Sequence, residues 1–280
     1  MKTQGSANYF RYGAFNKVAL LCLLLLLSCL LTACGGRQSA AFIIAGSTSV
    51  QSYVERLAEE YARLNPDVLI DVQGGGSSAG IQAVESETAE IGMSSRNLRE
   101  TEQHLWSIEI TKDGLAIIVH PNNPIRSLTL EQIRGIYSAE HTNWSELGGT
   151  DARIHIITRE EGSGTRGAFE EMVMQDRRIT PRAIVQNSNG AVRQLVSGDE
   201  YSIGFISLGL VEVGERPVKA VRIGEVAPTR ENVINGSYTL FRSFLFVARH
   251  EPTGNAMDFI EFILSPEGRK ILADEGLIPD

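Results

Sequence analysis

Cysteine and histidine, the residues that most often build disulfides and metal sites, are scarce in this sequence. It has 280 residues with three cysteines and five histidines. Cys22, Cys29 and Cys34 all lie near the N-terminus, so the chain beyond them has no disulfide framework and no cysteine metal site. The histidines show no close paired spacing, and we therefore expect no bound metal.

Basic residues are outnumbered as well. The 26 Lys and Arg residues stand against 34 Asp and Glu, a formal net charge of −8 at pH 7. Proteins that bind nucleic acid normally carry a basic patch and a positive balance, so we expect no nucleic-acid partner. A bound anion must then be held by donors that the fold groups locally. With 42% hydrophobic residues, the chain is suited to burying a sizeable core.

A long apolar run occurs at the N-terminus, over residues 18–33. Lys2, Arg11 and Lys17 precede it, and no acidic residue occurs before Glu55. A basic start followed by an apolar run is typical of an export signal peptide. The run is shorter than the roughly 20 apolar residues of a comfortable membrane span, and an N-terminal membrane anchor is the alternative. Both interpretations put the rest of the chain outside the cytoplasm.

The apolar run ends on Leu31-Thr32-Ala33-Cys34, which resembles the bacterial lipobox. In that motif the cysteine is lipidated and becomes the first residue after cleavage. We therefore predict a lipoprotein signal peptide over residues 1–33, lipidation of Cys34, and a lipidated tether over residues 34–40. The lipid would hold the protein in the cell envelope, at the outer face of the cytoplasmic membrane or in the periplasm.

Beyond the tether, short apolar runs alternate with stretches of helical spacing. Strands alternating with helices predict an α/β architecture with mostly parallel sheets, and the length suits two such lobes. A unit of strand, glycine-serine loop and helix occurs three times. The expected strands cover residues 41–45, 68–72, 90–96, 115–120, 153–158, 203–208 and 240–247, and the expected helices cover residues 50–64, 79–87, 129–137, 165–175, 190–197 and 255–274.

The glycine-serine loops of this unit are residues 46–49, 76–78 and 162–165. A helix start exposes up to four unpaired N–H groups and about half a positive charge, glycine lets the backbone come close, and Ser or Thr adds a hydroxyl donor. Each loop can therefore cradle an oxyanion or simply cap its helix. Arg159 precedes the last loop and offers a planar fork of donors for two oxygens. Residues 187–190 can line the same cleft or form a capped turn.

Five segments, taken together, resemble the phosphate-binding proteins of bacterial phosphate ABC transporters. The similarity runs in order through nearly the whole chain beyond the signal peptide. The five segments together are far more specific to this family than any one of them alone. The segments are Ala45–Ser49, Gly75–Gly80, Ile91–Arg96, Arg159–Thr165 and Tyr201–Ser207.

The resemblance implies a two-lobed fold of the type II periplasmic-binding-protein kind. Each lobe would be a mostly parallel sheet flanked by helices, and two crossing strands would join the lobes. Residues 41–118 with 240–280 would form lobe 1, and residues 119–239 would form lobe 2. The resemblance further implies a monomer without cofactor or catalysis, which captures inorganic phosphate between the lobes and delivers it to the permease subunits of an ABC transporter.

The phosphate ligands of the family carry over by position, with one departure at Ser95. Some members have an Asp there, whose carboxylate accepts a hydrogen bond from protonated phosphate and repels sulfate. Ser95 carries no charge, so a different tetrahedral oxyanion such as sulfate or molybdate is the alternative ligand, and Glu160, Glu161 or Asp113 could supply the acidic acceptor. The predicted ligand-binding residues are Thr48, Ser49, Ser77, Ser95, Arg96, Arg159, Ser163, Gly164 and Thr165.

Two other motifs predict different functions. Residues 162–167 match the G-x-G-x-x-G dinucleotide fingerprint, but no acidic residue ends a strand about 20 residues further on, as that site needs. Residues 76–80 match the G-x-S-x-G nucleophile elbow, which makes Ser78 the candidate nucleophile of a serine hydrolase. A triad would then use residues downstream, for example Asp199 and His250. This hydrolase is the enzymatic alternative.

Overall fold

The computed structural model describes residues 40–211 and 217–279. The predicted signal peptide, the Cys34 predicted to carry lipid, and residues 35–39 of the predicted tether lie outside these residues. The last residue of the predicted tether, Ala40, instead begins the first strand, because it pairs with Val68. Among the described helices, none combines the length and the apolar character that a membrane crossing requires.

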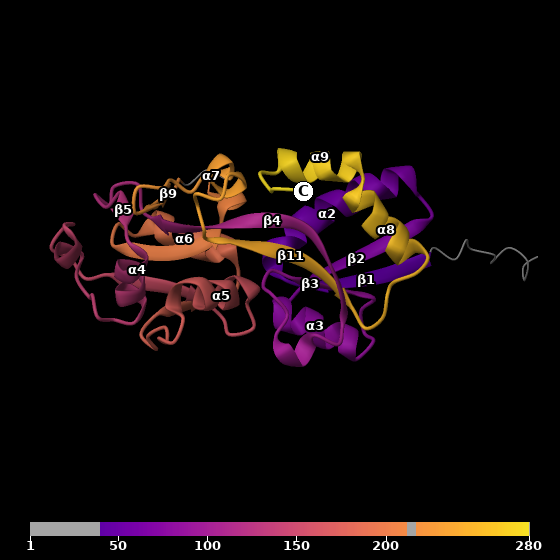
Figure 1. Cartoon of the computed structure of the whole chain (residues 1–280), viewed down its shortest axis with the longest axis horizontal. Helices are drawn as coiled ribbons and strands as arrows, with labels where there is room; N and C mark the ends of the chain where they lie inside the picture. The colour runs from indigo at the N-terminus through magenta and orange to yellow at the C-terminus, as the bar shows by residue number, and fades with distance from the viewer. Residues whose placement is uncertain (1–39, 212–216, 280) are drawn as a thin grey trace, which may run out of the picture. The chain divides into compact units, whose positions relative to one another are not determined.

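One large sheet runs through the described residues in the order β2-β1-β3-β11-β4-β8-β6-β7, with β9 also paired to β4 (Figure 1). A separate ladder joins β5 (Ser127–Leu128) to β10 (Arg222–Ile223). The strands of the large sheet are β1 (Ala40–Gly46), β2 (Val68–Gly74), β3 (Ile91–Ser94), β4 (Trp106–Val119), β6 (His155–Arg159), β7 (Ile184–Gln186), β8 (Ser202–Ser207), β9 (Lys219–Ala220) and β11 (Phe241–Ala248).

The two ends of this sheet are parallel, and its middle is antiparallel. Strand β1 pairs in parallel with β2 and β3, and β6 pairs in parallel with β7 and β8. Strands β4 and β11 lie side by side and antiparallel between these two groups (Figure 1). This arrangement confirms the predicted α/β class with two mostly parallel lobes and two connecting strands. We call them the β1–β3 lobe and the β6–β8 lobe; the residue boundaries given above stay a prediction.

The helices follow the strands in the predicted alternation. The α-helices are α2 (Thr48–Leu64), α3 (Ser77–Glu85), α4 (Leu130–Tyr137), α5 (Gly164–Phe169), α6 (Asn189–Gly198), α7 (Arg230–Ile234), α8 (Asn255–Leu264) and α9 (Pro266–Asp274). Short 3₁₀ turns are η1 (Glu100–Glu102), η2 (Trp144–Leu147) and η4 (Leu208–Leu210), and a π-helical segment, η3 (Glu170–Met174), continues α5.

In the β1–β3 lobe, helices cover both faces of the sheet. Val50, Val54 and Leu57 recur on one side of α2 and pack with Ile44 of β1 and Phe259 of α8. This spacing is the apolar stripe of an amphipathic helix. A separate cluster packs α3 against the other face of the sheet. The starts of α2 and α3 are thereby fixed at the ends of β1 and β2.

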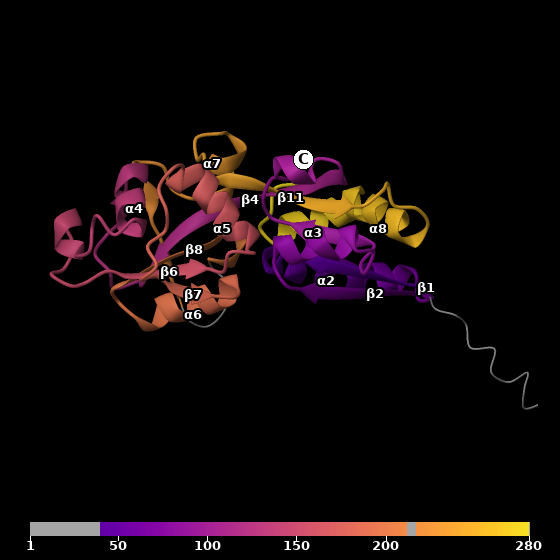
Figure 2. The same cartoon turned by 90° about the horizontal axis from the view of Figure 1, so that it is seen from below.

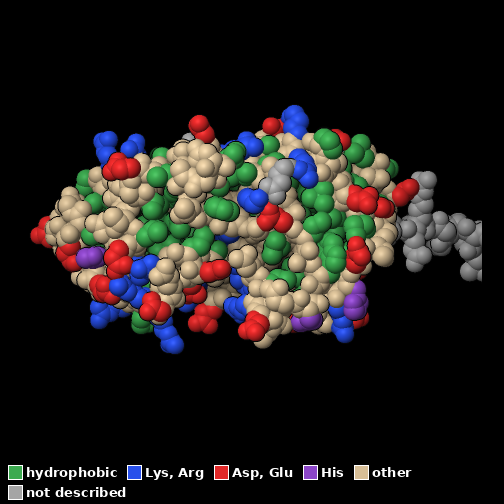
Figure 3. Space-filling view, viewed as in Figure 1, with side chains coloured by type: hydrophobic (Ala, Val, Ile, Leu, Met, Phe, Trp, Pro, Cys, Tyr) green, Lys and Arg blue, Asp and Glu red, His purple; other side chains and the backbone are tan. Residues whose placement is uncertain are grey.

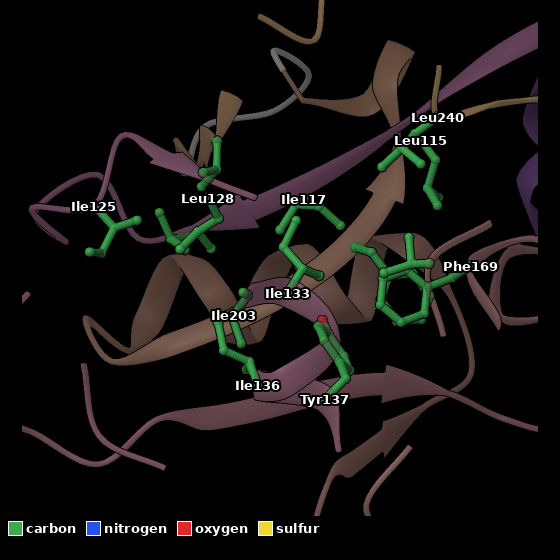
Figure 4. Packing of buried hydrophobic residues seen from close by; sticks show 14 of the residues in the cluster. Leu115, Ile117, Ile125, Leu128, Ile133, Ile136, Tyr137, Phe169, Ile203 and Leu240 are labelled. Carbon is green, nitrogen blue, oxygen red and sulfur yellow. The ribbon is translucent and has the colours of Figure 1, made fainter. Parts of the chain in front are cut away.

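In the β6–β8 lobe, the second half of β4 is buried on both faces. Leu115, Ile117 and Val119 pack with α4 and α5 (Figure 4), whereas Ala116 and Ile118 pack with α6. Figure 2 shows α6 on one side of β6 and β8, with α4 and α5 on the other. A strand covered on both faces consists of a nearly continuous run of apolar residues. This half of β4 could therefore be predicted from the sequence.

Two elements differ from the sequence prediction. Strand β4 begins at Trp106 rather than near Leu115, because its first half alternates polar and apolar residues and is stabilised by pairing with the distant β11. The helix expected over residues 165–175 changes to a π-helix at Glu170 and ends at Met174, and the φ of the next residue, Gln175, is 56°.

Candidate functional site

Three helices start at the predicted glycine-serine loops. The Ser47 Oγ caps α2 by accepting a hydrogen bond from the Ser49 N–H at 3.3 Å. The Ser163 Oγ caps α5 by accepting from the Arg166 N–H at 3.3 Å. Helix α3 has Gly76 at its cap, with no side-chain cap bond and a φ of 90° that favours glycine. Some of these hydroxyls therefore do serve as caps, as the structural interpretation of the loops expected.

The first and third loops meet although they are far apart in sequence. The Ser49 Oγ lies 2.7 Å from the Thr165 Oγ1, and the Asn189 Nδ2 donates to the Ser49 Oγ at 2.8 Å. All three side chains are at most 2% exposed. Because Asn189 begins α6, the starts of α2, α5 and α6 converge on one buried point.

The second loop joins the same cluster. The Ser47 Oγ donates to the Ser95 Oγ at 2.8 Å, and the Ser95 N–H donates to the Ser77 Oγ at 3.0 Å. Gly164 lies directly against this pair, since a Cβ built on it would clash with the hydroxyls of Ser77 and Ser95. The Ser78 N–H donates to the Gly162 carbonyl at 3.2 Å, which brings the start of α3 to the loop before α5.

Arg159 lies at the centre of these groups and is 1% exposed. Its Nη2 donates to the Thr48 Oγ1 at 3.1 Å. Its Nη1 donates to the Asn189 Oδ1 at 3.3 Å and lies 3.5 Å from the Thr165 Oγ1. A buried guanidinium with hydroxyl groups from separate helices around it is a set of donors suited to a tetrahedral oxyanion.

Glu160 lies on the other edge of the same guanidinium. Its Oε2 accepts from the Arg159 Nε at 3.0 Å, and its Oε1 accepts from the Arg159 Nη2 at 2.9 Å. The carbonyls of Gln186 and Asn187 accept from the Nε and the Nη2 at 3.2 Å each. These contacts fix the plane of the Arg159 guanidinium.

Arg96 is buried but directs its guanidinium elsewhere. Its Nη1 and Nη2 donate to the two carboxylate oxygens of Glu102 at 2.7 and 2.8 Å, and the Nη1 also donates to the Asn97 carbonyl. Burial alone would raise the pKa of Glu102, but the hydrogen bonds from Arg96 and from the Arg99 backbone outweigh burial and hold that pKa below its usual value. The role of Arg96 as a phosphate ligand therefore stays a prediction.

A second buried ion pair lies beside the cluster, between Asp113 of β4 and Arg242 of β11. The Asp113 Oδ2 accepts from the Arg242 Nη2 at 3.0 Å, and the Asp113 Oδ1 accepts from the Ser207 Oγ at 2.7 Å. The Arg242 Nη1 donates to the Ser95 carbonyl at 3.3 Å. Burial raises the pKa of Asp113, and Arg242 and Ser207 oppose that rise. Asp113 is thus engaged with these two residues.

The structure therefore brings most of the predicted residues together. Thr48, Ser49, Ser77, Ser95, Arg159, Ser163, Gly164 and Thr165 belong to one connected cluster. Sequence reasoning did not assign Ser47 or Arg242 to it and left Asn189 open. The sequence contains a feature that could have indicated each of the last two residues. Arg242 interrupts an apolar strand, and Asn189 follows Ser188, the cap of α6.

The residues of the alternative serine hydrolase, Ser78, Asp199 and His250, do not contact one another as a catalytic triad would. The Asp199 Oδ2 lies 2.6 Å from the His155 Nδ1 and accepts from the Ser202 Oγ. His250 is exposed just beyond the end of β11, whereas Ser78 contacts the loop before α5.

Among the residues with described positions, no three His, Cys, Asp or Glu side chains group as metal ligands would. On the face shown in Figure 3, basic and acidic side chains are interspersed.

Comparisons with known proteins show the family of this chain. The family model described as the PBP superfamily domain matches residues 32–267. A Clostridium perfringens protein, described as a phosphate ABC transporter substrate-binding protein with bound phosphate, is 43% identical, with a TM-score of 0.82 and coverage of 86% of this chain and 99% of that chain.

Two further relatives extend the comparison. An ABC-type phosphate transport receptor from Vibrio cholerae is 37% identical, with a TM-score of 0.73 and coverage of 85% of this chain and 100% of that chain. The phosphate-binding protein PstS of Bacillus subtilis is 29% identical over 87% of this chain and 82% of its own length.

Proposed function

Because this chain belongs to the PBP superfamily and groups buried hydroxyls around Arg159, we propose that it is an extracytoplasmic solute-binding protein that captures inorganic phosphate for an ABC transporter. Its similarity to the phosphate transport proteins of Clostridium perfringens, Vibrio cholerae and Bacillus subtilis supports phosphate as the ligand. The protein binds and releases this ligand without changing its covalent structure.

One observation carries the proposal: hydroxyl groups from both lobes meet around a guanidinium that is 1% exposed. Removing an anion from water is costly unless hydrogen bonds replace its hydration, and charge-assisted bonds from arginine are among the strongest available. Thr48, Ser49, Ser77 and Ser95 belong to the β1–β3 lobe. In the other lobe, Arg159 is the last residue of β6, and Ser163, Gly164 and Thr165 follow that strand. We assign these residues to the phosphate site.

Donors from two lobes also give the binding its mechanism. An anion that contacts both lobes binds the closed arrangement better than an open one, and that difference in affinity is what drives closure. The permease subunits of the transporter would then recognise the closed form and receive the phosphate. We assign the protein to the cell envelope as a monomer, held by the lipid on Cys34 at the outer face of the cytoplasmic membrane or in the periplasm.

Calorimetric titration of the purified protein with phosphate, sulfate and molybdate tests the ligand. We expect phosphate to bind, and Arg159→Gln to weaken that binding by about a hundredfold or more, because the loss of a buried charged partner costs several kcal/mol. Arg153→Gln is the matched control, since Arg153 is exposed just before β6, and should bind phosphate as the unmodified protein does.

The other outcomes distinguish the alternatives. Binding of sulfate or molybdate but not of phosphate would assign the site to another tetrahedral oxyanion, in keeping with the uncharged Ser95. Turnover of a p-nitrophenyl ester that Ser78→Ala abolishes, without binding of any of these anions, would replace the proposal with a serine hydrolase.

A further inference from the structure

The two edges of the Arg159 guanidinium face different surroundings. On the side of the hydroxyl cluster, the Nη2 donates to the Thr48 Oγ1 at 3.1 Å and the Nη1 donates to the Asn189 Oδ1 at 3.3 Å. The edge formed by Nε and Nη2 is held by both carboxylate oxygens of Glu160, at 3.0 and 2.9 Å. A carboxylate on one edge leaves the other edge aimed at the proposed phosphate site.

The Glu160 carboxylate also lies close to the start of α3 in the other lobe. Its Oε1 lies beside Gly76, the cap of α3, since a Cβ built on Gly76 would be 3.5 Å from that oxygen. A helix N-terminus favours a negative charge, and this one has no side-chain cap bond. The Glu160 side chain is 31% exposed, compared with 1% for that of Arg159. Glu160 therefore contributes a fixed negative charge at the margin of the cluster.

The other charges around the cluster form closed pairs. Arg96 is paired with Glu102, and Arg242 with Asp113. Arg166 donates to the Arg159 carbonyl through Nη1 and to the Glu170 carboxylate through Nε. Since Glu160 balances Arg159 in the same way, an entering anion meets hydrogen-bond donors with little net positive charge.

We propose that Glu160 is a specificity-determining residue: its carboxylate orients Arg159 and disfavours anions that carry more negative charge. This inference rests on the proposed function. Two negative charges a few ångströms apart in a partly buried site repel each other strongly, and the repulsion grows with the charge of the ligand. Glu160 then replaces, from the opposite lobe, the acidic group that Ser95 lacks.

The test compares Glu160→Gln with Glu161→Gln. The neighbouring Glu161 is exposed, so its substitution changes the net charge equally without touching the guanidinium. We expect Glu160→Gln to strengthen sulfate binding about tenfold or more and Glu161→Gln to leave it within about twofold of the unmodified protein. Glu160→Ser removes the charge in a second way and should give the same gain.

The pH profile of the unmodified protein tests the inference without any substitution. Phosphate takes its second negative charge between about pH 6 and 8, whereas sulfate has the same charge throughout. Phosphate affinity, measured relative to sulfate affinity, should therefore fall over this interval, and Glu160→Gln should reduce that fall.

Three results distinguish a failure of the role proposed for Glu160 from a failure of the proposed phosphate binding. A Glu160→Gln protein with the sulfate affinity and phosphate pH profile of the unmodified protein would overturn the role of Glu160 and leave phosphate capture standing. A relative phosphate affinity that rises with pH in the unmodified protein would do the same. Absence of phosphate binding by the unmodified protein at every pH would overturn the proposed function itself, and the sulfate titrations would still test Glu160.

Discussion

Three arginines in the described part of the chain are buried, and each has a carboxylate of its own. Arg96, Arg159 and Arg242 are 4%, 1% and 5% exposed. Taking a guanidinium out of water is costly, and removing its partner leaves a buried charge uncompensated. The chain therefore places a carboxylate beside each of them, whether the guanidinium holds the fold together or faces the proposed ligand.

The pair of Arg96 and Glu102 should make stability depend on pH. Because the pKa of Glu102 is lowered in the folded state, its contribution is fully present above the pKa of the unfolded chain and is lost as pH falls through the folded value. We expect Glu102→Gln to lower the free energy of unfolding by about 2–4 kcal/mol near pH 7, and the difference from the unmodified protein to shrink in acid.

Urea unfolding measured from pH 7 down to pH 3 checks this expectation. Glu100→Gln is the control, because Glu100 is an exposed residue in the same 3₁₀ turn. A difference between Glu102→Gln and the unmodified protein that stays constant across this range would show that the carboxylate charge is not the cause.

Sequence reasoning was sufficient for those site residues whose chemistry is visible locally. The hydroxyls at the helix starts, such as Ser49 and Thr165, follow from glycine-serine loops after strands. Contacts between side chains that are far apart in sequence could not be predicted, because no local sequence pattern encodes them. Arg242 finds Asp113 only through the pairing of β11 with β4, and Arg159 reaches Asn189 only because β7 lies beside β6.

At the scale of the element, close approach of helix starts is what assembles the cluster. Gly164 opens α5 with its backbone against Ser77 and Ser95. The absence of a side chain there lets α5 reach α3 and the end of β3 at the same time. Glycine at this position therefore has a packing reason that is separate from backbone flexibility.

Gly164→Ala should weaken phosphate binding about tenfold or more, because the new methyl group pushes the Ser77 and Ser95 hydroxyls out of place, a packing clash that also costs about 1–3 kcal/mol of stability. Calorimetry with phosphate and urea unfolding measure the two effects. Gly198→Ala is the matched control, since a Cβ at Gly198, the last residue of α6, meets nothing within 4 Å.

Comparison of the two glycine variants tests whether the contact at Gly164 matters for phosphate binding. Gly198→Ala should bind phosphate normally and be up to about 1 kcal/mol more stable, because alanine is the better helix former. Equal phosphate affinities in both variants would contradict the role assigned to the contact at Gly164.

Secondary structure was predictable where each element carries its own signal. The stripe of α2 and the doubly buried half of β4 are recognisable from local pattern alone. The first half of β4 was missed because its polar side chains, Glu109 and Asp113 among them, hide a strand that tertiary pairing stabilises. Strand β7 has only three residues, and its place in the sheet is defined by pairing with β6.

At the scale of the whole molecule, the proposed lipid on Cys34 would determine where the protein acts. A chain that delivers phosphate to a permease must stay near it, and a lipidated N-terminal cysteine provides the attachment. We expect Cys34→Ser to abolish incorporation of radiolabelled palmitate, because the thiol that would carry the lipid is lost. Phosphate affinity should not change, since Cys34 precedes every residue assigned to the site.

The matched substitution for this experiment is Cys29→Ser, which changes a cysteine inside the predicted signal peptide and should leave labelling intact. Palmitate incorporation that persists in Cys34→Ser would contradict the lipobox interpretation. Membrane association without any lipid label would instead favour the N-terminal membrane anchor.

Strand β4 belongs to both lobes, since residues Trp106–Gly114 pair with β11 and residues Leu115–Val119 pair with β8. The pairing of β4 passes from β11 to β8 between Gly114 and Leu115, next to Asp113. Asp113 accepts hydrogen bonds from Arg242 at this junction, and Arg242 donates to the Ser95 carbonyl. The junction between the two halves of β4 is therefore connected by two successive contacts to Ser95, which we assign to the phosphate site.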